Sequence, residues 1–197
     1  MKKNVLVVAI ASLLLVACKS SNGDKEPEKK YISLQSLVEK QVAHIDTSLY
    51  SIRKVVIIDS LHSDTTYIRR EDFRSVAKDF LDIPDLSDPK IANRYKEESR
   101  YDSLIKRVVI TYTPIDPEKE EVKKLEMLVS PEIAKDGNNK VTGIIVDRVR
   151  NNRNGYFAQN MLWRTDKSFL ITTTTQKPGE EEVITITKVT WNEEEYQ

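Results

Sequence analysis

The chain has 197 residues, with 31 basic and 31 acidic side chains and a single cysteine. Equal numbers of basic and acidic side chains give no reason to expect a nucleic-acid partner, which normally requires a strongly basic face. A single cysteine excludes a scaffold of internal disulfides. Hydrophobic residues make up 39% of the chain, enough to build a domain with a sizeable core.

The N-terminus has the pattern of a targeting segment. Lys2 and Lys3 supply positive charge, and an apolar run follows over residues 5–15. This run is shorter than the about 20 apolar residues of a membrane-spanning helix, but it fits the hydrophobic region of a signal peptide. We therefore predict a signal peptide over residues 1–17.

The run ends at Leu15-Val16-Ala17-Cys18, which resembles the lipobox of bacterial lipoprotein precursors. The resemblance implies cleavage before Cys18 and attachment of lipid, palmitate among its acyl chains, to that cysteine. It further implies a small lipoprotein of the bacterial cell envelope, bound to the membrane through Cys18. Lys19 stands where an aspartate commonly signals retention in the inner membrane. The resemblance thus implies the outer membrane, on its periplasmic side or at the surface.

Residues 18–30 are predicted to be the lipidated cysteine followed by a flexible polar tether. The stretch KSSNGDKEPEKK, residues 19–30, contains no large apolar side chain and cannot bury enough surface to offset the entropy cost of ordering. As a flexible coil it would reach about 20 Å. What remains, residues 31–197, has the length of one domain.

The first part of this domain is predicted to be mostly helical. An apolar stripe with helical spacing follows Ser33, a suitable N-cap, and comprises Leu34, Leu37, Val38, Val42, Ile45 and Leu49. Residues 55–58 and 65–68 are predicted to form two short paired strands. A second helix is expected over residues 73–81, and a third begins at Asp88-Pro89, with Tyr95 pointing inward.

From residue 104 onward the hydrophobic period changes to two, as in strands. Six alternating runs cover residues 106–112, 125–129, 141–150, 157–163, 169–173 and 183–191. Short turns join them, so neighbouring runs are expected to be antiparallel. Helices first and strands afterwards predict an α+β fold, with N-terminal helices packed on a C-terminal antiparallel meander of about six strands.

The sequence contains no pattern that names a catalytic chemistry. Its two histidines, His44 and His62, lack the spacing of a zinc site. Five glycines provide neither a nucleophile elbow nor a phosphate-binding loop. We therefore predict no catalytic residue, no metal and no cofactor.

Four arginines, Arg148, Arg150, Arg153 and Arg164, cluster around one predicted turn. Such a cluster suits an anionic partner, for example a lipid headgroup or a glycan phosphate. The alternative is a solvated end of the sheet.

These patterns favour a non-catalytic binding or assembly module of the envelope rather than an enzyme. Docking of another envelope protein by an edge strand or by the arginines is preferred, and no nucleic-acid partner is expected. One alternative is a carrier that holds a hydrophobic ligand in a curved sheet; another is a carboxylate-based hydrolase. The sequence leaves the oligomeric state open.

Overall fold

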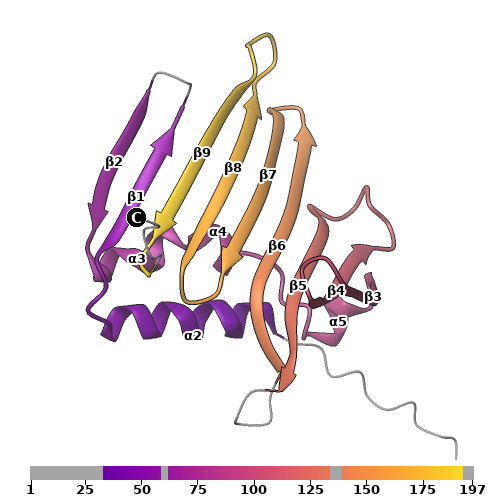
Figure 1. Cartoon of the computed structure of the whole chain (residues 1–197). Coiled ribbons are helices and arrows are strands. Elements are labelled where there is room, and N and C mark those ends of the chain that lie inside the picture. The colour runs from indigo at the N-terminus through magenta and orange to yellow at the C-terminus, as the bar shows by residue number, and fades with distance from the viewer. Residues whose placement is uncertain (1–32, 59–61, 134–138, 193–197) are drawn as a thin grey trace, which may run out of the picture. The chain divides into compact units, whose positions relative to one another are not determined.

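The alternating runs form antiparallel strands in the structure, a computed structural model that describes residues 33–58, 62–133 and 139–192 (Figure 1). Six strands follow one another as a meander: β4 (Arg107–Pro114), β5 (Val122–Ile133), β6 (Asn139–Asn152), β7 (Gly155–Arg164), β8 (Ser168–Gln176) and β9 (Val183–Thr190). Each pairs with the next in antiparallel register. The six predicted strands are therefore all present.

The sheet is larger than predicted, because strands outside the meander extend both of its edges. At one edge β3 (Tyr95–Asp102) pairs with β4. At the other edge the hairpin of β1 (Ile52–Ile57) and β2 (Ser63–Ile68) joins through β1 to β9. The strand order is β2-β1-β9-β8-β7-β6-β5-β4-β3, a nine-stranded sheet. The predicted meander is therefore confirmed, and the predicted strand pair at residues 55–58 and 65–68 corresponds to β1 and β2. Only β3 was not predicted as a strand.

Helices are short and few in the described residues, so the fold is mostly β rather than the predicted α+β. The longest of them, α2 (Leu34–Thr47), begins where the side chain of Ser33 accepts a hydrogen bond from the backbone N–H of Ser36. The predicted second helix is divided into α3 (Arg70–Val76) and α4 (Lys78–Leu81). The third, α5 (Pro89–Ala92), is capped by Asp88 as predicted.

The helices α2, α3 and α4 contribute to the same core as one face of the sheet. At its centre Trp163 of β7 is fully buried and stacks on Phe169 of β8, with ring centroids 5.3 Å apart. Phe80 of α4 meets Trp163 edge to face at 5.1 Å, and Phe73 of α3 meets Trp191 at 5.2 Å. Aromatic pairs in this geometry contribute about 0.5–1.5 kcal/mol each beyond the area they bury.

The opposite face of the sheet carries half-buried aliphatic side chains. Ile145, Leu162 and Leu170 lie side by side across β6, β7 and β8, because each is paired with the next in register. Their neighbours Trp163 and Phe169, one residue along each strand, belong to the helix-covered face. This alternation is what a two-residue period produces in a strand.

Residues Tyr31–Gln197 form one compact unit. The predicted signal peptide 1–17, Cys18 and the tether lie outside the described residues. No helix in the described part of the chain combines the length and apolar character needed to cross a membrane.

Candidate functional site at the arginine end

The hairpin of β6 and β7 brings three of the four predicted arginines together. Its register places Arg148 opposite Gln159 and Arg150 opposite Phe157. Arg153 lies in the turn that joins Asn152 to Gly155 and is exposed. We call the group of Arg148, Arg150, Arg153 and Phe157 the arginine end.

The fourth predicted residue, Arg164, lies at the other end of the same hairpin. It pairs in register with Gly143 and, through its Nε, donates a hydrogen bond to Ser168 Oγ at 3.0 Å. The length of β7 separates it from Gly155, about 30 Å at the usual rise of a strand. Arg164 is close to the other arginines only along the sequence, and it does not belong to the arginine end.

Two guanidinium groups of the arginine end share one carboxylate. Arg148 binds Glu121 Oε2 through Nε and Nη2 at 3.1 and 3.0 Å, and Arg150 Nη1 lies 3.8 Å from Glu121 Oε1. Arg153 makes no ion pair with any side chain that the structure describes. The local charge is therefore positive, and it is fixed in place by β6 and by the loop that precedes β5.

The ring of Phe157 supports both of these cations. The guanidinium carbon of Arg150 lies 4.9 Å from the ring centroid, and that of Arg148 lies 5.9 Å away. Both distances are within the range of a cation–π contact, worth about 0.5–1 kcal/mol at an exposed site. The aromatic ring and Glu121 together hold the two arginine side chains in place.

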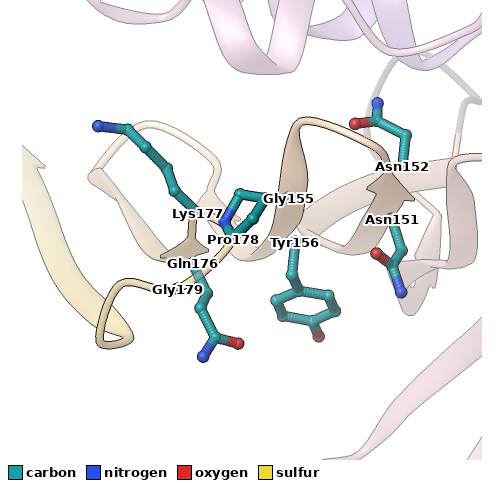
Figure 2. Close-up of a pocket in the computed structure, with 8 residues that line it drawn as sticks. All are labelled: Asn151, Asn152, Gly155, Tyr156, Gln176, Lys177, Pro178 and Gly179. Atoms are coloured by element: carbon teal, nitrogen blue, oxygen red, sulfur yellow. The ribbon is translucent and has the colours of Figure 1, made fainter.

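A shallow hollow of about 460 Å³ lies beside the arginine end, between the turns of two hairpins. Its lining comes from β6 and β7 at one hairpin and from the β8–β9 connection at the other: Asn151, Asn152, Gly155, Tyr156, Gln176, Lys177, Pro178 and Gly179. Figure 2 shows the Tyr156 ring between the side chains of Asn151 and Gln176, on one face of the sheet. These three side chains lie next to one another because Tyr156 is paired in register with Asn151 on β6 and with Gln176 on β8.

A second hollow, of about 300 Å³, is lined in part by Arg150 and Phe157 and adjoins the same turn. Arginine and aromatic residues are enriched where proteins bind one another. Both hollows share Asn152, Gly155 and Tyr156, so this end of the sheet offers a continuous, uneven polar and aromatic surface.

An apolar hollow beneath the sheet bears on the carrier alternative. It lies between α2 and the strands β6 and β7, where Leu37, Ile144 and Trp163 contribute to its lining, and holds about 130 Å³. Pockets for small ligands usually measure about 300–1,000 Å³. This hollow therefore has room for a few methylene groups rather than for an acyl chain.

The carboxylates bear on the hydrolase alternative. The pKa values of Glu98, Asp102 and Asp116 lie below their usual range, chiefly because each accepts a hydrogen bond from a lysine or arginine side chain. A carboxyl group that acts as a general acid needs a raised pKa instead, so these three groups are unsuited to that role. Within residues 33–58, 62–133 and 139–192 no three metal-binding side chains lie together.

Compared with known protein families, characterised proteins and solved structures, the chain shows no match.

Proposed function

We propose that this protein is a bacterial envelope lipoprotein, anchored to the outer membrane through a lipidated Cys18, whose folded domain binds another envelope protein through the arginine end. The lipobox residues Leu15-Val16-Ala17-Cys18 support the anchor. An anchor with two or more acyl chains holds a protein stably on a bilayer. The domain would then act by presenting a binding surface, without catalysis.

The observation that carries the binding proposal is the pair of guanidinium groups on Phe157. Arg148 and Arg150 have a single carboxylate, Glu121, between them, so a carboxylate of a partner can complete the charge balance. Binding hot spots are enriched in arginine, tryptophan and tyrosine, and phenylalanine is enriched at interfaces together with them. Here the ring and Glu121 reduce the entropy that the arginines would lose on binding.

The edge strand β3 is less suited to docking. The edge strand β3 carries ion pairs between Lys96 and Glu98 and between Arg100 and Asp102, at 2.6 and 3.0 Å. Charged side chains on an edge strand oppose the addition of a further strand. This favours the arginine end over strand addition at β3.

Photo-crosslinking in the native cells tests the binding proposal. A crosslinking side chain at Asn154, exposed beside Arg153, should give one adduct of defined mass with a protein that resides in the envelope. Arg148→Glu with Arg150→Glu should remove that adduct. The matched control is Arg69→Glu with Arg70→Glu, a double charge reversal at the exposed start of α3. An adduct that survives in the Arg148/Arg150 variant would rule out the arginine end as the docking surface.

Mass spectrometry of the mature N-terminus tests the anchor separately. The expected N-terminal residue is Cys18 with its added diacylglyceryl and acyl mass. A chain that still begins at Met1, or an unmodified Cys18, would contradict the lipid anchor. Cys18→Ser should leave the precursor unprocessed, and the folded domain should keep its melting temperature.

A further inference from the structure

Two large aliphatic side chains are exposed at the tip of the β3–β4 hairpin. Leu104 has 92% of its surface exposed and Ile105 has 48%. Tyr101, at the end of β3, is also largely exposed. Single exposed aliphatic residues are common on proteins, whereas adjacent ones at the tip of a hairpin form a protruding apolar surface.

Hydrogen bonds fix the shape of this tip. Asp102 Oδ1 accepts from the backbone N–H groups of Leu104 and Ile105, at 3.0 and 3.4 Å. Lys106 has a φ of 53°, and its carbonyl oxygen accepts a hydrogen bond from Arg107 Nη1 at 2.9 Å. The aliphatic side chains are therefore held outward by a structured turn.

Basic residues flank the two aliphatic residues in the hairpin. Residues 100–107 contain three basic side chains and one carboxylate: Arg100, Lys106 and Arg107, and Asp102. Arg100 Nη1 binds Asp102 Oδ2 at 3.0 Å, which leaves Lys106 and Arg107 in excess. A protruding apolar tip with basic residues beside it suits the surface of a bilayer that contains anionic lipid.

The tip lies at the end of the sheet where α2 crosses the strands. Arg107 Nε donates to Thr142 Oγ1 at 3.2 Å, and the backbone N–H of Thr165 donates to the carbonyl oxygen of Thr142 at 3.2 Å. In the same turn, Asp166 exchanges hydrogen bonds with Gln41 of α2. Figure 1 shows α2 running along this end, with the β6–β7 and β8–β9 turns at the other.

We propose that Leu104 and Ile105 enter the headgroup region of an anionic lipid bilayer and orient the domain on the membrane. The proposal rests on the proposed function in one respect, that a lipid on Cys18 brings the domain to the bilayer. The tip then selects one orientation, with its own end of the sheet towards the membrane. The arginine end, at the opposite ends of the strands, would face away and be accessible to a partner.

Fluorescence of a reporter tryptophan tests insertion. Leu104→Trp in the full chain, mixed with vesicles of phosphatidylcholine and phosphatidylglycerol, should shift its emission to shorter wavelength. Brominated acyl chains in the same vesicles should quench that emission at least twofold. The native Trp163 and Trp191 are buried and supply a constant background. The matched control is Ile115→Trp. Ile115 is 69% exposed and directly follows the C-terminal end of β4, away from the tip. The emission of this variant should stay unquenched.

Sedimentation with the vesicles separates this proposal from the anchor. A lipidated Leu104→Trp chain that sediments while its reporter emission is unquenched would overturn the tip proposal and leave the anchor intact. If the purified chain carries no lipid, the anchor fails, and quenching of the Leu104→Trp variant by anionic vesicles alone decides the tip proposal. Equal quenching of the Leu104→Trp and Ile115→Trp variants would also overturn it, because the domain would then have no preferred orientation.

Discussion

The guanidinium carbon of Arg150 lies 4.9 Å from the centre of the Phe157 ring, directly across the β6–β7 pair. This contact couples a cation of the arginine end to the sheet that supports it. A double-mutant cycle with Arg150→Ala and Phe157→Ala should give a coupling of about 0.5–1 kcal/mol in urea unfolding. The matched cycle with Arg153→Ala and Phe157→Ala should give none, since Arg153 lies in the turn. Equal couplings in the two cycles would show that the ring does not hold Arg150.

Gly155 is predicted to be intolerant of a side chain. Its φ is 125°, and a Cβ there would lie 2.3 Å from the carbonyl oxygen of Gln176. Gly155→Ala must therefore shift the β7–β8 pair as well as strain the backbone, with an expected loss of about 2 kcal/mol or more in the free energy of unfolding.

Gly179 supplies the matched control for this substitution. Its φ is also positive, at 78°, but a Cβ there would meet no atom within 4 Å. Gly179→Ala should cost about 1 kcal/mol, from the left-handed backbone alone. Thermal or urea unfolding measures both variants, and a smaller loss for Gly155→Ala than for Gly179→Ala would contradict the packing of the two hairpins.

Much of the sheet could be predicted because its central strands alternate. In β7, Met161 and Trp163 face the core while Leu162 lies on the other face, and such runs are legible in the sequence. The edge strand β3 could not be found this way, because its residues YKEESRYD are mostly exposed on both faces. Tyr95 was therefore expected in a helix, and it begins β3 instead.

The pairing of β1 with β9 also could not be predicted from the sequence pattern. The β-branched residues 55–58 predict a strand, but nothing in the local sequence indicates that Val55 will lie opposite Lys188. The same limit applies to the arginines. Proximity along the chain grouped Arg164 with Arg150, whereas the length of β7 carries Arg164 to the opposite end of the hairpin.

Alkaline pH should destabilise the fold through Tyr95. Burial, with a further contribution from Glu120, raises the pKa of the Tyr95 hydroxyl to about 12. A tyrosine with a raised pKa in the folded state stabilises the fold fully below the unfolded pKa of about 10, and this contribution is lost as the pH rises through about 12. The expected loss between these limits is on the order of 2 kcal/mol.

Tyr95→Phe isolates this effect from other groups that titrate in the same range. The variant loses weak hydrogen bonds to Glu120 and Val122, both 3.4 Å long, so it should be slightly less stable at neutral pH. Between pH 10 and 12 its unfolding free energy should fall less steeply than that of the wild type. Tyr67→Phe, at an exposed position of β2, should match the wild type. Parallel curves for all three proteins would contradict the assignment to Tyr95.

The domain should fold without the proposed lipid and tether. Every buried residue of the described core cluster lies between Leu34 and Trp191, so a chain that begins at Tyr31 keeps all of them. We expect it to be soluble and to melt in one cooperative transition, followed by circular dichroism with a predominant strand signature. The control chain begins at Tyr50 and so lacks α2, which buries Leu34, Val38, Val42 and Ile45. The control chain should aggregate or melt without cooperativity, because the apolar face of the sheet that α2 covers would be exposed to water. Aggregation of the chain that begins at Tyr31, or an equally sharp melt for the control, would contradict the place of α2 in the core.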